Sequence, residues 1–175
     1  AWSHCNNFRY HVWWHKALMH LDQGQIDAVL DLYDTAIRAD KTDDYRDISN
    51  ATSLLMRLEL EGFDVGARWR ELADLSAART EDGCLIFADL ALTADNREAE
   101  VAQMLGRMHR DAQGTGDMNA RMADPGLAAA QGLSAFGEAR YGEAFAQLLH
   151  ARTAMHMAGG SHAQRDVFER LTIDA

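Results

Sequence analysis

The chain contains little proline, little cysteine and no long hydrophobic run. One proline in 175 residues leaves long stretches free to form helices, because proline interrupts the hydrogen bonds of a helix. Cys5 and Cys84 are too few and too far apart for the disulfide framework of a small secreted domain. No run of about 18 apolar residues is present to form a membrane-spanning helix. These absences indicate a helical, cytoplasmic protein with reduced thiols.

Positive charge is also scarce. The 17 Lys and Arg residues stand against 27 Asp and Glu residues, which gives a net charge of −10. Nucleic acids and anionic membranes both attract proteins through an excess of Lys and Arg. The composition therefore argues against nonspecific binding to nucleic acid or to a membrane, and it favours a neutral or basic protein partner.

The N-terminal segment AWSHCNN lacks the basic and apolar parts of an export signal. It also lacks an initiator methionine. We expect residues 1–175 to form a single domain that belongs to a longer protein, and nothing in the sequence indicates an oligomeric state.

Apolar residues recur with the period of an α-helix along most of the chain, and no run alternates as a β-strand does. The connections at 39–46 and 112–124 are polar and are predicted to be loops. Breaks in the pattern predict nine helices, at residues 8–22, 26–38, 47–61, 65–79, 83–94, 97–111, 125–138, 141–156 and 161–173.

Small or β-branched residues recur in the second helix of four helix pairs. Val29, Ala67, Val101 and Ala144 lie 38, 34 and 43 residues apart. Helical repeats have periods of this size, and each leaves an apolar face that only a stacked neighbour covers. The predicted fold class is therefore all-α: a right-handed α-α superhelix, of about four helix pairs and a terminal helix, like the solenoid of tetratricopeptide repeats (TPR).

Other positions of the helix pairs match the tetratricopeptide pattern. The small residue of the first helix is Ala17 or Gly132, and small residues let two helices approach to about 8–10 Å. The third pair departs from the pattern with Asp89 at this position, and the second pair lacks the usual small residue. The turns between paired helices fall at Gly24, Asn96 and Ala139.

Several helix ends carry recognisable signals. Gly24 and Gly62 suit left-handed helix ends, and Asp124-Pro125 reads as an N-cap followed by proline at the first helical position. Ser161 and Gln164 have the spacing of a capping box, in which each side chain bonds the other residue's backbone N–H. We expect this box to open the last helix.

Histidines are the best candidates for chemistry. His4, His11 and His15 fall within roughly 40° of one helical face. Two imidazoles one turn apart can grip a divalent metal, but they make only half of a tetrahedral site and no third ligand is evident. We therefore predict no resident metal and no cofactor. The alternative role is packing, with Trp13 and Trp14, at the seam between the first two helix pairs.

A Ser/His/Asp reading of Ser161, His162 and Asp166 is disfavoured. Adjacent residues on a helix point in different directions, and Ser161 already has a role as a cap. No catalytic residue is predicted.

Four segments together resemble one known family. They are HVWWHKAL (11–18), LYD (32–34), LLMRLELEGFDVGARW (54–69) and GGSHAQRD (159–166). The chain resembles the C-terminal half of the tetratricopeptide repeat protein 38 family over most of residues 8–168. The resemblance implies a cytoplasmic TPR-like array without established enzymatic activity, in a protein longer at both ends. One departure is Ala88-Asp89-Leu90-Ala91, where the family has an Asn-Asp-x-His string.

The candidate ligand-binding residues form two groups, far apart in the sequence. The first comprises His11, Trp14, His15, Asp47 and Arg57. The second lies at the start of the last helix and comprises His162, Gln164, Arg165 and Asp166. Four stacked pairs would separate the groups by tens of ångströms, so we expect two separate patches on one concave surface.

The second group begins at a helix N-terminus, which favours a carboxylate or a phosphate. The alternative for Arg165 and Asp166 is an internal salt bridge that holds the last helix to the fourth pair.

We expect a non-enzymatic scaffold that binds a peptide or protein segment on its concave face, around His15, Trp14, Arg57 and Arg165. Aromatic and Arg side chains are the types that anchor interfaces. The alternatives are an enzyme, or a protein that binds a small ligand or a metal through its histidine-rich first pair.

Overall fold

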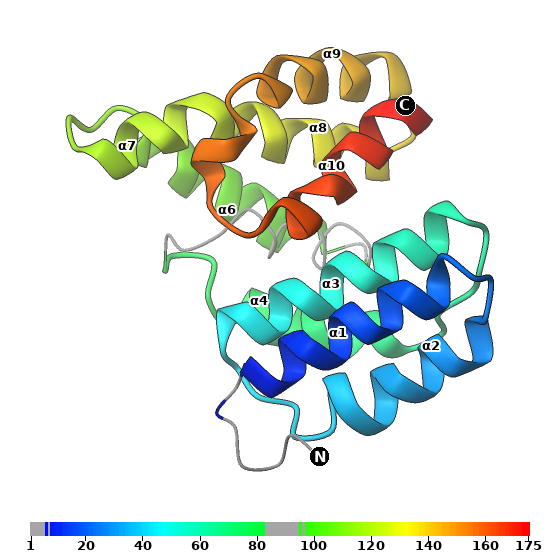
Figure 1. Cartoon of the computed structure of the whole chain (residues 1–175). Helices are drawn as coiled ribbons and strands as arrows, with labels where there is room; N and C mark the ends of the chain where they lie inside the picture. The colour runs from blue at the N-terminus through cyan, green and yellow to red at the C-terminus, as the bar shows by residue number, and fades with distance from the viewer. Residues whose placement is uncertain (1–5, 7, 83–94, 96) are drawn as a thin grey trace.

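The computed structural model of the chain describes residues 6, 8–82, 95 and 97–175. Every regular element within these ranges is helical, which confirms the all-α class (Figure 1). The elements are α1 (Phe8–Leu21), α2 (Ile26–Leu32), η1 (Tyr33–Ile37), α3 (Tyr45–Leu60), α4 (Arg68–Ala77), α6 (Glu98–Asp111), α7 (Asp117–Arg121), η2 (Met122–Gly126), α8 (Leu127–Gly137), α9 (Tyr141–Arg152), η3 (Met155–Ala158) and α10 (His162–Asp174).

Most helix bounds lie within three residues of those predicted. The predicted helix at 83–94 and the turn residue Asn96 lie outside the described residues, as does His4. One prediction is wrong: the connection at 112–124 is not all loop, because it contains the short helix α7. The predicted helix at 26–38 is present but changes type, since α2 continues as the π-helical turn η1.

Local backbone signals act as predicted at four positions. Gly24 and Gly62 have φ values of +68° and +85°, in the left-handed region that favours glycine. Ala139 also ends its helix with a positive φ of 57°. Ser161 caps α10: its hydroxyl accepts from the Gln164 N–H at 3.2 Å, and its own N–H donates to Gln164 Oε1 at 2.7 Å.

The Asp124-Pro125 prediction is wrong in detail. Asp124 has the extended backbone expected before proline, with φ −149° and ψ 119°. However, no side chain caps the following helix, and regular α-helical geometry starts only at Leu127. The chain instead passes through the π-helical turn η2 between α7 and α8.

Small residues permit close packing in the first and last helix pairs. Val29 and Ala144 are fully buried, as the repeat register requires, and Val101 is half-buried against the core. A Cβ atom at Gly132 of α8 would lie 2.7 Å from Leu148 Cγ of α9, so only glycine fits at this contact.

Ala67 does not share this register. It is exposed and lies before the first residue of α4, because Gly66 turns the chain with a φ of +62°. The buried positions of α4 are Trp69, Leu72, Ala73 and Ser76. The second pair therefore packs through a different set of residues.

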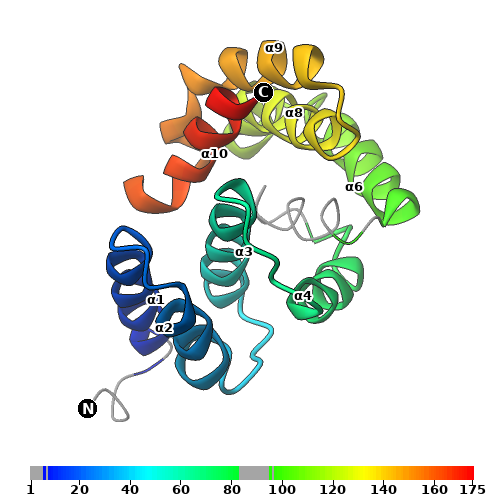
Figure 2. The same cartoon turned by 90° about the vertical axis from the view of Figure 1, so that its right-hand side faces the viewer.

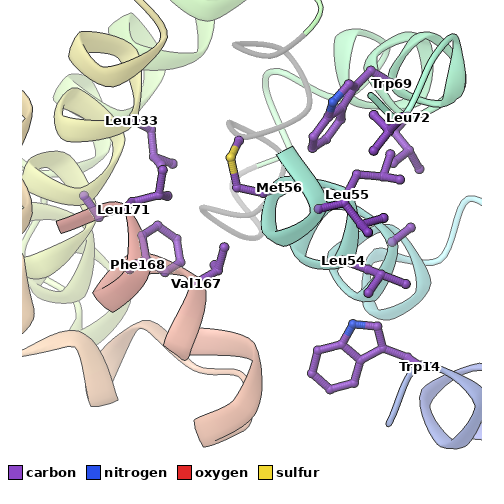
Figure 3. Close-up of a cluster of buried hydrophobic side chains, with 14 of the residues drawn as sticks. Trp14, Leu54, Leu55, Met56, Trp69, Leu72, Leu133, Val167, Phe168 and Leu171 are labelled. Atoms are coloured by element: carbon purple, nitrogen blue, oxygen red, sulfur yellow. The ribbon is translucent and has the colours of Figure 1, made fainter. Parts of the chain in front are cut away.

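The last helix returns to the first half of the chain. Helices α1 to α4 form one group and α6 to α9 another, and α10 packs on both α9 and α3 (Figure 2). Val167 and Phe168 of α10 face Met56 of α3 within the hydrophobic core (Figure 3). Trp14 of α1 contributes to the same core on the other side of α3. The core is thus one cluster that joins the two groups of helices.

Among the described helices, none combines the length and the apolar character needed to cross a lipid bilayer.

Candidate functional site

Helix α10 brings the two predicted groups of residues together. Gln164 Nε2 donates to Asn50 Oδ1 at 2.9 Å. Arg57 Nη2 donates to the Ala163 carbonyl oxygen at 2.6 Å and lies 3.4 Å from Asp166 Oδ2. The prediction of two separate patches is therefore wrong. The chain curls enough that its last helix packs against α3, which itself packs against α1.

Arg57 is the buried centre of this contact. Only 2% of its surface is exposed, and its Nη1 donates to the Ser53 carbonyl oxygen at 2.8 Å. Its guanidinium carbon lies 6.0 Å from the centre of the Trp14 ring. Burial disfavours the charged form and lowers the pKa of Arg57 to about 10, while the nearby Asp166 carboxylate opposes this effect.

Asp166 forms the internal ion pair foreseen for the last helix, but with different partners. It accepts from Arg57 of α3 and, at 3.1 Å, from Arg170 one turn along α10. The expected partner was the fourth helix pair. The neighbouring Arg165 instead donates to the Gly159 carbonyl oxygen at 3.2 Å and to that of Gly160, closing the turn before α10.

A chain of polar side chains runs from the α10 cap to α1. Asn50 Oδ1, which accepts from Gln164, also lies 3.1 Å from His11 Nδ1. His11 Nε2 in turn lies 3.1 Å from His15 Nε2. Residues Ser161, Gln164, Asn50, His11 and His15 therefore make one connected path, here called the histidine relay.

Aromatic packing holds the two histidines in place. The Trp14 ring stacks on His11 with centroids 5.2 Å apart and meets His15 edge-on at 4.8 Å. Partial burial, together with the nearby His11 ring, lowers the pKa of His15. Trp14 Nε1 and Asn50 Nδ2 are buried without a hydrogen bond to any described residue.

Asp47 belongs to a different contact. It is buried in the first turn of α3, where it accepts a hydrogen bond from the Thr42 hydroxyl at 2.5 Å. Burial raises its pKa, and the Thr42 hydrogen bond opposes this. Its role in this contact is to fix the chain that enters α3.

A pocket lies between α9, η3 and α10, and none of the residues of the histidine relay lines it. Its volume is about 200 Å³. Leu148, Met155 and Phe168 contribute apolar surface to it, and His162 and Arg165 contribute polar groups. The other lining residues are Ala151, Arg152, His156, Asp166, Glu169 and Thr172. Arg152 Nε donates to Glu169 at 2.7 Å, so this pair is neutral as a unit.

Sequence reasoning located most of the residues that α10 joins but missed Asn50, Arg152 and His156. Asn50 lies seven residues before Arg57 on α3, so both fall on one helical face. That spacing was an available signal. Nothing local marks Arg152 or His156, because they face the pocket only through the packing of α9 and η3 on α10.

No protein-family model matches the chain, and no solved structure matches it.

Proposed function

We propose that this protein is a non-enzymatic, cytoplasmic, TPR-like scaffold that binds a segment of a partner protein. The observation that carries the proposal is the α9–α10 pocket, which has apolar walls and a polar rim. Small-molecule sites are usually about 300–1,000 Å³. A volume of about 200 Å³ suits one anchoring side chain of a longer segment better than a whole small ligand.

The binding surface differs from the one expected from the sequence. Trp14 is fully buried and Arg57 is 2% exposed, so neither can contact a partner. Both act in the core, where Arg57 binds backbone carbonyls of α3 and α10. Of the candidate ligand-binding residues, His162, Arg165 and Asp166 line the pocket. Asp166 is already paired with Arg57 and Arg170.

The pocket favours an anchor that joins an acidic group to an apolar one. Arg165 uses only Nη1 in its hydrogen bonds within the described residues, which leaves Nε and Nη2 as donors. Guanidinium groups pair well with carboxylates. Leu148, Met155 and Phe168 would cover the apolar part of the anchor. Because the chain has a net charge of −10, the residues of the partner segment that flank this acidic group should be neutral or basic.

A non-enzymatic role is supported by the geometry at Ser161. Its hydroxyl accepts the Gln164 N–H and so serves as a helix cap. Among the described residues no hydrogen bond joins the Ser161 hydroxyl to His162, so the Ser161, His162 and Asp166 combination lacks the serine–histidine contact that activates a nucleophile.

Selection from a random peptide library displayed on phage tests the proposal. Peptides enriched on the wild-type chain should bind at least about tenfold more weakly to Arg165→Glu, because the reversed charge repels the acidic anchor. His162→Glu is a second variant, since His162 is exposed and outside the core. Arg70→Glu on α4, also exposed, is the matched control and should bind as wild type.

His162→Glu and Arg70→Glu should keep their thermal midpoints; Arg165→Glu also loses its hydrogen bonds to the Gly159 and Gly160 carbonyls, so its binding is compared at a temperature at which it is folded. Enrichment of no peptide, or equal loss of binding in Arg70→Glu, would contradict the proposal.

A further inference from the structure

We propose that His11 and His15 form an exchangeable two-ligand site for a divalent transition metal, and that the histidine relay prepares it. The site does not use the α9–α10 pocket, so a result that contradicts one proposal leaves the other unaffected. Metal binding at this site depends on which ring nitrogen of each histidine carries a proton and which carries a lone pair.

The relay determines the orientation of each amide in turn. Gln164 Oε1 accepts the Ser161 N–H, so the other atom of this amide, Nε2, is a donor. Gln164 Nε2 donates to Asn50, which makes the accepting atom of Asn50 its oxygen, Oδ1. His11 Nδ1 lies 3.1 Å from that oxygen and must therefore carry the proton. In neutral His11 the lone pair is then on Nε2.

The His11 lone pair points at the second ring. Nε2 of His11 and Nε2 of His15 lie 3.1 Å apart. Two metal–imidazole bonds of about 2.0–2.1 Å at tetrahedral or octahedral angles bring their nitrogens to about 2.9–3.4 Å. The two atoms already have this separation. A metal about 2.0–2.1 Å from both nitrogens would lie beside the line that joins them, so each ring would rotate to point its lone pair at the metal, without a change in the backbone of α1.

His15 can offer its Nε2 because it is exposed to solvent. Before binding, His15 Nε2–H donates to His11. On binding, that proton moves through water to His15 Nδ1, and each imidazole nitrogen replaces one water on the metal. Two neutral imidazoles thus become two ligands with no net release of protons, and water completes the coordination.

The surroundings resemble those of established histidine ligands. A metal-bound histidine usually donates its other N–H to a carbonyl or carboxylate oxygen, and losing that partner typically weakens metal binding about 10–100-fold. Asn50 Oδ1 is such a partner for His11, and Gln164 fixes it from α10. Stacking on Trp14 further limits rotation of the His11 ring.

Copper(II) is the metal that should bind most tightly. Imidazole ligands suit copper, nickel and zinc, and affinity rises along the series to copper before falling at zinc. Two protein ligands leave the remaining positions to water, so the metal exchanges readily. Such a site agrees with the sequence-based prediction that no metal is resident, since an exchangeable ion is lost in purification.

Titration of the full chain with copper(II) in a non-coordinating buffer, followed by calorimetry, tests the site. We expect one equivalent that binds reversibly and more strongly than any further copper, weakened at least about tenfold in His15→Ala, because one of the two ligands is lost. His15 is exposed, so this variant keeps its core. His109→Ala on α6 is the matched control, an exposed histidine elsewhere, and should bind as wild type.

Electron paramagnetic resonance of the copper complex should show two equatorial imidazole nitrogens in the wild type and one in His15→Ala. Gln164→Leu should weaken binding measurably, by no more than the roughly 10–100-fold typical of losing a direct partner such as Asn50, while keeping both nitrogens, because it removes the group that orients Asn50. Equal copper affinity in wild type and His15→Ala, or a single nitrogen in the wild-type spectrum, would overturn the site. Unchanged affinity in Gln164→Leu would overturn the role of the relay.

Discussion

Gln164 takes part in two contacts, the cap of α10 and a hydrogen bond between α10 and α3. Its Oε1 and its backbone N–H complete the cap of α10, and its Nε2 binds Asn50 of α3. The cap joins two residues three positions apart and follows from the sequence. The bond to Asn50 joins residues more than a hundred positions apart and requires the closure of the chain. One side chain thus links the start of the last helix to the histidines of the first.

At the same scale, the lowered pKa of His15 has a consequence for stability. Its folded-state pKa lies below the ordinary value of 6.5, because burial and His11 disfavour the charged ring. As the pH falls through 6.5 toward the folded value, the unfolded chain takes up a proton that the folded chain does not. The free energy of unfolding therefore decreases across this window.

Urea unfolding at about pH 7.5 and about pH 5.5 measures this effect. We expect His15→Gln to lose less stability than the wild type between the two values, because glutamine does not titrate. An unchanged pH dependence in His15→Gln would contradict the assignment.

At the scale of helices, α8 and α9 show how a small residue sets the distance between partners. Gly132 lies directly against Leu148, and an added Cβ would also approach the Leu148 backbone nitrogen to 3.2 Å. The backbone cannot give way as a flexible side chain can. The glycine is therefore a packing requirement of this pair, as the repeat pattern predicted.

Gly132→Ala should destabilise the protein by about 1 kcal/mol. Overpacking costs about 1–3 kcal/mol, and the better helix propensity of alanine offsets about 1 kcal/mol of that. Gly142→Ala on α9 is the control, because its new methyl group would meet open space, and it should be neutral or stabilising. Thermal or urea unfolding of the two variants compares them; a stabilised Gly132→Ala would refute the close packing.

At the scale of the whole molecule, α10 determines how the two groups of helices are joined. Phe168 is 4% exposed and belongs to a core that extends from α1 to α10. Around it, Arg57 and Gln164 make polar bonds between α3 and α10. Apolar contact and hydrogen bonds thus act at the same junction, so the molecule should unfold as a unit.

Phe168→Ala should cost about 3–5 kcal/mol, the usual range for removing a buried phenylalanine. Trp14 and Trp69 lie in the first group of helices, so tryptophan fluorescence in urea reports on that group, and circular dichroism reports on all helices. Both midpoints should fall together. Phe145→Ala, which truncates an exposed phenylalanine on α9, should stay near the wild type. A fall seen by circular dichroism alone would show that the groups unfold independently.

Local features of the sequence determined the helices and several of their ends. Helical periodicity, Gly24, Gly62 and the Ser161 cap act between residues a few positions apart, so they could be recognised without a structure. The close contact at Gly132 was also recognisable, because the two helices of a pair are neighbours in the chain. The predicted place of Ala67 within a helix was wrong because, after the turn at Gly66, α4 begins only at Arg68.

Only the tertiary structure decided which candidate residues meet and which are accessible. Arg57 and Trp14 were expected on a surface, but the return of α10 buries Arg57 against Ala163, and α1 packs Trp14 into the core. The curvature of a helical array accumulates from small rotations between successive pairs. No single residue specifies that sum. Whether His11 and Gln164 would share Asn50 or lie tens of ångströms apart therefore depended on the packing of every helix between them.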